Sequence, residues 1–268
     1  MHSTIQDVQM WGMNITILPA LQDNYMYLIT DTKTREAAVV DPVNPELVLK
    51  TVERDKVNLT KILTTHHHWD HSGGNKKLLR MYPQPLDVYG ADDRIDGLTV
   101  RVQHNYCFSI GKLKVLCIAT PCHTKGHMCY YVENINMEHA IFTGDTLFQG
   151  GCGHFFEGTA EQMYDNLNKK FTVIPYDTQV YCGHEYTLKN LTFAQHVEPK
   201  NDVIGKRLQW AKQRRAILAP TIPSTIGQER QFNPFMRVNQ PSVQQHVSED
   251  DPIATMATLR REKNSFKA

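Results

Sequence analysis

The stretch TTHHHWDH, residues 64–71, holds four histidines and one aspartate within eight residues. Imidazole and carboxylate groups together are typical ligands of zinc and non-haem iron. His66, His68 and Asp70 alternate, and alternate side chains of an extended segment point the same way. We therefore expect these three to face one point, with His71 joining them after a bend where a helix begins. A lone histidine would carry little information, whereas H-x-H-x-D-H predicts a metal site.

Three further apolar segments each end at a residue that could bind a metal ion. KVLCIATPC precedes His123, HAIFTG precedes Asp145, and TQVYCG precedes His184. Functional groups often lie on loops that a rigid scaffold holds near one another. With the first cluster, these positions supply five histidines and two aspartates. That set is too large for one four-coordinate zinc ion and suits two metal ions.

The elements that must position these residues are short strands joined by loops, with helices between them. Apolar alternation and β-branched residues predict strands at 14–18, 25–29, 36–41, 61–65, 86–90, 114–120, 128–133, 139–145 and 178–184. Helical periodicity and capping residues predict helices over 74–82, 158–171, 188–197, 202–218 and 251–266. Thr159 is the expected N-cap of the second of these helices, with Gln162 completing a capping box. We therefore expect a mixed α/β (α+β) domain over residues 1–185, followed by a small helical domain over residues 186–268.

The overall charge excludes some classes of partner. The 268 residues have a net charge of +1, whereas a dedicated nucleic-acid binder usually has a strong basic excess. Residues 185–268 contain 13 basic and 8 acidic residues, a net charge of +5, which suits either an anionic partner or a solvated basic surface. No apolar run approaches the roughly 20 residues of a membrane span. We expect a monomer that acts on a small molecule and binds neither nucleic acid nor a membrane.

The cysteines and the N-terminal residues indicate a reducing compartment. None of the six cysteines has C-x-x-C spacing, and residues 1–12 contain no lysine or arginine. That segment is a poor signal peptide and a poor mitochondrial presequence. We expect reduced thiols and a cytoplasmic protein. Met13 offers a second start, which leaves a mitochondrial form as the alternative.

Several longer motifs give the chain a resemblance to a known family. They are TTHHHWDHSGGN, TPCHTKGHMCYY, FTGDTLFQGGCGHFFEGTAEQMY and YCGHEYTLKNL, with NPFMRV and LRREKNSFK near the C-terminus. The chain resembles the metallo-β-lactamase superfamily and, within it, the glyoxalase II (hydroxyacylglutathione hydrolase) family, over nearly its whole length. The first motif alone indicates only the superfamily, whereas GCGHFFEGTA, GHEYT and RREK are typical of glyoxalase II. The resemblance implies a four-layer αβ/βα sandwich with a dinuclear site at its edge and a small all-α C-terminal domain that closes over the substrate.

The resemblance also implies how the ligands divide, which the spacing alone leaves open. The bridging residue would be Asp145; one ion would be held by His66, His68 and His123, and the other by Asp70, His71 and His184. The expected catalytic residues are His66, His68, Asp70 and Asp145, and by our hypothesis Asp70 also orients the attacking water. Two metal ions per chain are expected, zinc first, with iron and manganese as alternatives. His127 and Asp41 are interpreted as structural or ligand-supporting residues.

The activity implied by the resemblance is the hydrolysis of S-D-lactoylglutathione, and of other S-2-hydroxyacylglutathiones, to glutathione and a 2-hydroxy acid. This reaction is the second step of methylglyoxal detoxification. Two metal ions can bring the pKa of a bridging water from 15.7 to around 7, which supplies the hydroxide that a thioester needs. The expected substrate-binding residues are His154, Phe156, Tyr186, Asn190, Arg260 and Lys263.

Two residues of the GCGHFFEG loop depart from the family pattern. His154 stands where the family commonly has lysine, and Phe156 stands where it often has tyrosine. The unperturbed pKa of histidine is near 6.5, so we expect glutathione binding to weaken at alkaline pH as His154 loses its charge. The departure leaves room for a different acyl-thiol substrate. Two alternatives follow: a persulfide dioxygenase-like member that uses one iron, and a metal-binding homologue without turnover.

Overall fold

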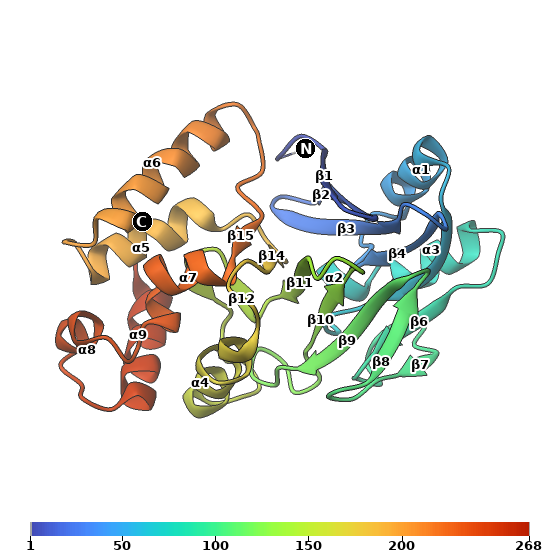
Figure 1. The fold of residues 1–268 in the computed structure, drawn as a ribbon. Coiled ribbons are helices and arrows are strands. Elements are labelled where there is room, and N and C mark those ends of the chain that lie inside the picture. The colour runs from blue at the N-terminus through green and yellow to red at the C-terminus, as the bar shows by residue number, and fades with distance from the viewer. Residues whose placement is uncertain (1, 268) are drawn as a thin grey trace.

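The computed structural model describes residues 2–267 and consists of two facing sheets with helices on their outer faces (Figure 1). The strands of the first sheet follow chain order: β1 (Gln6–Met10), β2 (Met13–Ala20), β3 (Asn24–Asp31), β4 (Glu36–Val40), β5 (Asn58–Leu63), β6 (Asp87–Gly90) and β7 (Val100–Arg101). The second sheet has the order β15 (Ser224–Thr225), β14 (Gln179–Cys182), β11 (His139–Gly144), β10 (Met128–Glu133), β9 (Leu113–Ala119) and β8 (Cys107–Ile110). A small hairpin joins β12 (Leu147–Phe148) to β13 (Gly151–Cys152).

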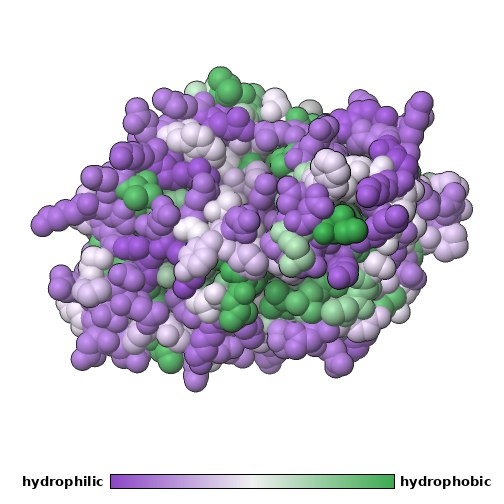
Figure 2. Space-filling view, in the orientation of Figure 1, coloured by the Kyte–Doolittle hydropathy of each residue, from purple (hydrophilic) through white to green (hydrophobic). Residues whose placement is uncertain are grey.

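Helices account for most of the remaining regular structure. Along the chain they are α1 (Pro45–Asp55), α2 (Trp69–Ser72), α3 (Asn75–Met81), α4 (Ala160–Asn168), α5 (Thr187–Val197), α6 (Asp202–Ala216), α7 (Ile226–Phe232), α8 (Pro241–Val247) and α9 (Pro252–Ser265). Short 3₁₀ helices span Lys170–Val173 and Pro234–Met236. Within residues 2–267, no helix is both long enough and apolar enough to cross a membrane. Figure 2 shows a largely hydrophilic face, with apolar residues gathered across its lower middle.

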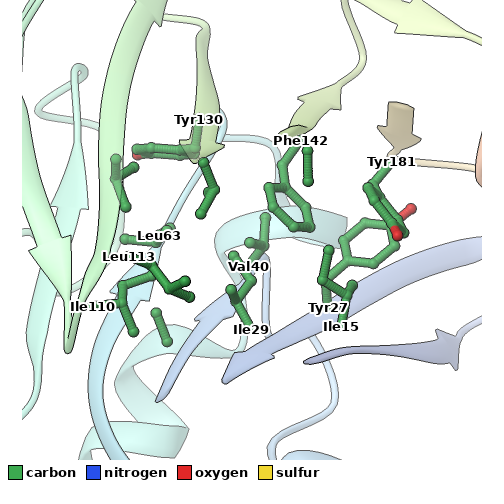
Figure 3. Packing of buried hydrophobic residues seen from close by; sticks show 14 of the residues in the cluster. Ile15, Tyr27, Ile29, Val40, Leu63, Ile110, Leu113, Tyr130, Phe142 and Tyr181 are labelled. Atoms are coloured by element: carbon green, nitrogen blue, oxygen red, sulfur yellow. The ribbon is translucent and has the colours of Figure 1, made fainter. Parts of the chain in front are cut away.

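The main core lies between the two sheets. Ile15, Tyr27 and Val40 from the first sheet meet Tyr130 and Phe142 from the second (Figure 3), and all five are almost wholly buried. Burying an aliphatic or aromatic side chain of this size stabilises the fold by about 1.5–3 kcal/mol. The contact between sheets therefore fixes where their strand ends lie relative to one another.

Two further apolar clusters cover the outer faces of the sheets. Val48 and Val52 of α1, with Leu78 of α3, pack on the first sheet. Leu167 of α4 and Leu259 of α9 belong to the cluster on the second. The order is thus helices, sheet, sheet, helices, which confirms the predicted four-layer architecture.

Most predicted elements are present, with differences at particular places. The capping box of α4 is confirmed, because the Thr159 hydroxyl accepts from Gln162 N and the Gln162 side chain accepts from Thr159 N. Helix α1 was not predicted, although Asn44 caps it and Pro45 occupies its first turn. The region after residue 186 is helical, as expected, apart from the two-residue strand β15, which pairs with β14. The domain boundary at residues 185 and 186 stays a prediction.

Buried tyrosines hold the strand ends from inside the sandwich. The Tyr130 hydroxyl, on the second sheet, donates to the Thr64 carbonyl of the first at 2.8 Å. The Tyr27 hydroxyl, on the first sheet, donates to the Cys182 carbonyl of the second. The Met128 amide donates to the Thr65 carbonyl at 2.8 Å. These bonds between sheets fix the backbone just before His66 and just before His184.

Candidate metal centre

The seven predicted ligands lie together at one edge of the sandwich, on segments that follow β5, β9, β11 and β14. They are His66, His68, Asp70, His71, His123, Asp145 and His184. The expected extended run through Asp70 is wrong in one respect, because α2 begins at Trp69 and places Asp70 in its first turn. Trp69 lies outside the cluster, with 71% of its surface exposed.

Three imidazoles form the first group. His66 Nε2 lies 3.0 Å from His68 Nδ1, and His123 Nε2 lies 3.2 Å from the same His68 atom. The carboxylate of Asp145 approaches this group through Oδ2, which is 3.4 Å from His123 Nε2.

Two imidazoles and a carboxylate form the second group. His71 Nε2 and His184 Nε2 are 3.2 Å apart. Asp70 Oδ2 lies 3.6 Å from the His71 nitrogen and 3.5 Å from the His184 nitrogen. The other oxygen of Asp145, Oδ1, is 3.4 Å from each of these two nitrogens. Asp145 thus lies between the groups and turns one oxygen toward each.

These separations fit metal ions better than they fit hydrogen bonds. A tetrahedral ion with bonds of about 2.0–2.1 Å holds its donor atoms roughly 3.3–3.4 Å apart, and the donors here are separated by 3.0–3.6 Å. Asp145 Oδ1 is buried without a hydrogen-bond partner among the described residues. A buried oxygen without a partner is costly. The donor set therefore suits two ions on either side of Asp145.

Contacts behind the ligands fix the orientation of three of the five imidazole rings. His71 Nδ1 lies 2.9 Å from Asp41 Oδ2, His184 Nδ1 lies 2.9 Å from Asp23 Oδ1, and His123 Nδ1 lies 3.0 Å from the His154 carbonyl. Such partners hold the tautomer and the direction of a metal-binding histidine. Asp41 combines this contact with a positive φ of 48°, so it is both a turn residue and a ligand support.

Two supporting residues, Asp23 and Asn24, were missed from the sequence, where they lie between the predicted strands at 14–18 and 25–29. Asp23 contacts His184, and Asn24 Nδ2 donates to Asp70 Oδ2 at 3.0 Å. A carboxylate and an amide side by side in the turn that faces YCGH were the available indication of this role.

His127 supports the centre without facing it. Its Nε2 accepts from the Asp145 amide at 3.1 Å, and its Nδ1 lies 2.9 Å from the Thr120 hydroxyl. Both nitrogens are therefore engaged, and the ring stacks on His66 with centroids 5.1 Å apart. The expectation of a structural or supporting role fits these contacts.

Burial and neighbouring charges shift the pKa values of several candidate ligands. Burial lowers the pKa of His66 well below its ordinary value and the pKa of His123 to about 4, so both rings are neutral and can offer lone pairs. Burial would raise the pKa of Asp145, but His184 and His71 outweigh it and hold that pKa well below its ordinary value. The carboxylate is therefore ionised at neutral pH.

A pocket of about 280 Å³ adjoins the centre. Its lining residues are Asp23, Phe148, Cys152, His154, Tyr186, Lys189, Asn190, Arg260 and Lys263. Five of the six predicted substrate residues thus meet there. Phe156 does not line the pocket: it is 63% exposed and stacks on His154 with centroids 5.1 Å apart. Lys189 was missed, although its place in GHEYTLKN, between Tyr186 and Asn190, indicated it.

The cations of the pocket differ in burial: Arg260 is buried, Lys263 is half-buried and Lys189 is exposed. Arg260 is only 5% exposed, and its Nη1 donates to the Cys152 carbonyl at 2.9 Å. An ordinary solvated helix face is therefore excluded for this residue. Burial, Arg260 and Lys189 lower the pKa of Lys263 to about 8.

The surroundings of His154 bear on its expected role in the pH dependence of binding. Burial, Arg260 and Lys263 lower the pKa of this imidazole below its ordinary value. A lower pKa leaves less charge on this ring for alkaline pH to remove, and the expected weakening of glutathione binding through His154 stays a prediction. Lys263, with its pKa lowered to about 8, is a second group of this pocket whose charge falls in the alkaline range.

Family models match almost the whole chain in two parts. Residues 21–184 match the model described as metallo-beta-lactamase superfamily, and residues 185–266 match the model described as hydroxyacylglutathione hydrolase C-terminus. The residues of the metal centre lie in the first match, and Tyr186, Lys189, Asn190, Arg260 and Lys263 lie in the second.

Individual relatives agree with these models. The chain is 50% identical over 258 residues to a protein of Arabidopsis thaliana named hydroxyacylglutathione hydrolase cytoplasmic, covering 95% of this chain and 100% of the relative. It is 48% identical over 257 residues to a hydroxyacylglutathione hydrolase-like protein of Gallus gallus, covering 95% and 91%. Among solved structures, ETHE1 from Myxococcus xanthus matches with a TM-score of 0.65 and 23% identity over 98% of this chain and 92% of that one, a likeness of fold alone.

The close approach of Gly183 to the centre gives a test of this geometry. A Cβ at Gly183 would lie 2.4 Å from Asp145 Oδ1 and 2.9 Å from His71 Cε1. We predict that Gly183→Ala displaces the carboxylate and weakens metal binding roughly 10–100-fold, the range seen when a ligand's support is disturbed. Competition with a chromogenic chelator measures the affinity. Gly205→Ala is the matched control, because its nearest neighbour would be 3.7 Å away. Equal metal affinity in the two variants would contradict the placement of Asp145.

Proposed function

The chain belongs to the hydroxyacylglutathione hydrolase (glyoxalase II) family of the metallo-β-lactamase superfamily, and we propose that it hydrolyses S-D-lactoylglutathione to glutathione and D-lactate. The main observation behind this proposal is that the Asp145 carboxylate lies between two groups of imidazoles, beside a pocket lined by Arg260, Lys263 and Lys189. The chain is thus an enzyme of the thioester hydrolase class. Other S-2-hydroxyacylglutathiones are included in the proposal, since the acyl group would lie on the metal side of the pocket.

We assign seven residues as ligands of a dinuclear centre. Asp145 would bridge the two ions; His66, His68 and His123 would complete one site, and Asp70, His71 and His184 the other. When bound, the ions supply Lewis-acid polarisation of the thioester carbonyl and lower the pKa of a water molecule. Imidazole and carboxylate donors suit zinc first, with iron and manganese as alternatives.

The residues around the centre orient the reacting groups. Asn24 holds the carboxylate of Asp70 at 3.0 Å, so that this carboxylate can accept a hydrogen bond from the attacking water. The sulfur leaves as a thiolate, and because a thiol has an ordinary pKa near 8.5, no strong acid need protonate it. This accounts for the absence of an acid among the residues assigned to the reaction.

The pocket would bind the glutathione part. Arg260, Lys263 and Lys189 present positive charge to the carboxylates of glutathione, which is the pairing that buried carboxylates require. Tyr186, whose ring stacks on His184 at a centroid distance of 4.7 Å, would lie where the pocket meets the centre. His154 and Asn190 would complete the contacts, with Phe156 acting only through its stacking on His154.

The cellular location can be proposed from a relative, whereas the oligomeric state cannot. The Arabidopsis thaliana relative is named cytoplasmic, and we propose the same location for this chain. A mitochondrial form and a monomeric state stay predictions.

Hydrolysis of S-D-lactoylglutathione by the purified protein, with metal content measured on the same sample, tests the proposed function. We predict turnover with close to two ions per chain, loss of turnover after chelation, and recovery when zinc is returned. Disappearance of the thioester absorbance gives the rate. The control is a chelated sample mixed with magnesium, an ion that prefers oxygen ligands and should not restore activity.

Two results would overturn the proposal. Turnover of a persulfide with one iron per chain would favour a dioxygenase of the same fold. Two tightly bound ions without turnover of any 2-hydroxyacyl thioester would favour a metal-binding homologue that is not an enzyme.

The lowered pKa of Lys263 predicts a pH dependence. Its ammonium is charged below about pH 8 and neutral above it. The attraction for glutathione carboxylates is therefore present at neutral pH and lost as the pH rises. Arg260, Lys189 and Cys152 are the ionisable groups that shift this pKa. We predict that kcat/KM falls roughly tenfold above pH 8, about the effect of losing one charged hydrogen bond. Lys263→Arg, which stays charged, should remove this fall.

The matched control is Lys200→Arg, at an exposed lysine that does not line the pocket. It should keep the wild-type pH profile. An unchanged alkaline fall in Lys263→Arg would show that Lys263 is not the titrating group.

A further inference from the structure

Three ligand-type side chains meet on the C-terminal helices and share no residue with the candidate metal centre. They are His196 in the last turn of α5, His246 in the last turn of α8, and Glu262 on α9. We propose that these three residues form an additional site for a divalent transition-metal ion, with Zn²⁺ as the ion that best suits two imidazoles and one carboxylate. Two histidines and one glutamate also form the protein ligand set of some zinc enzymes.

The geometry of this three-residue cluster, here called the helical site, supports the assignment. His196 Nε2 lies 2.8 Å from Glu262 Oε1, and His246 Nε2 lies 3.1 Å from each of the two Glu262 oxygens. The two rings are nearly perpendicular, at 86°, with centroids 5.0 Å apart. Both imidazoles thus turn the same nitrogen toward one carboxylate. A shift of a few tenths of an ångström would bring each imidazole nitrogen to the roughly 3.3 Å separation from the Glu262 oxygens that a tetrahedral ion imposes.

Access and local charge favour a hydrated cation. The side chains of His196, His246 and Glu262 are 47%, 20% and 30% exposed, so an ion can enter and keep water in its remaining position. His196 and His246 lie at the C-terminal ends of their helices, where the partial negative charge of the backbone carbonyls favours a cation.

The helical site is adjacent to Lys263, a proposed substrate-binding cation. Glu262 precedes Lys263 on α9, and the Lys263 ammonium lies 5.2 Å from the centroid of the Phe193 ring. Phe193 is on α5, with its ring centroid 6.3 Å from that of His196. An ion here would join α5, α8 and α9, so binding should stabilise the helical region and restrict α9.

The experiment starts from protein that already holds two equivalents of Zn²⁺, so that the dinuclear centre is full. Titration with further Zn²⁺, followed by calorimetry and by metal analysis after gel filtration, should give a third equivalent in wild type. His196→Gln and His246→Gln should each bind only two. His104→Ala is the matched control at an exposed histidine and should bind three.

Thermal unfolding gives an independent measurement. At a hundredfold excess of Zn²⁺ over its dissociation constant, the Tm of the wild-type protein should rise by about 5 °C, and the Tm of either glutamine variant should not rise. Circular dichroism shows whether the variants are folded, and the glutamine side chains keep a hydrogen-bonding group of similar length.

The outcomes separate this proposal from the proposed function. A wild-type protein that binds only two ions, or a third ion that persists in both glutamine variants, overturns the helical site. Thioester hydrolysis by the variants, which still hold two ions, should equal that of wild type. The third ion could be lost in the glutamine variants while the wild-type protein fails to cleave glutathione thioesters. That pair of results would support the helical site and contradict the proposed function.

Discussion

The convergence of buried lone pairs on Asp145 is the constraint on which the rest of the site depends. Imidazole nitrogens from three separate segments come within 3.0–3.6 Å of one another or of a carboxylate, and Asp145 Oδ1 has no hydrogen-bond partner among the described residues. Such an arrangement is costly unless a cation occupies it. The two-sheet core provides the rigidity that holds it, since Tyr130 and Tyr27 each bond from one sheet to a backbone carbonyl of the other just before a ligand.

The C-terminal region depends on the same edge of the sandwich. Asn233 Nδ2 donates to the Phe148 and Gly151 carbonyls, and the buried Glu229 accepts from the Gly150 amide at 2.9 Å. Arg260 adds a bond to the Cys152 carbonyl. The loop that leads from Asp145 to His154 is therefore held from behind by α7, α9 and the segment between them. The pocket and the candidate metal centre are therefore fixed by one set of contacts. Under the proposed function, this arrangement would let a substrate held by its glutathione end present its thioester to the metals.

Local pattern was enough to predict the ligands because each follows an apolar strand or belongs to the H-x-H-x-D-H motif. The same pattern could not show that α2 begins at Trp69, since one turn of helix and an extended segment both bring Asp70 toward the imidazoles. It also could not find Asp23 and Asn24, whose roles come from the pairing of the β2–β3 turn with the segment at His184, a contact between residues far apart in sequence. The lowered pKa of His154 could not be predicted either, because burial, Arg260 and Lys263 cause it and all three arise only in the folded chain.

Anomalous diffraction from crystals grown with two equivalents of zinc tests the central claim most directly. We predict two peaks about 3.5–4 Å apart on either side of the Asp145 carboxylate. One should lie among His66, His68 and His123, and the other among Asp70, His71 and His184. A single peak, or two peaks that leave Asp145 without a metal contact, would contradict it.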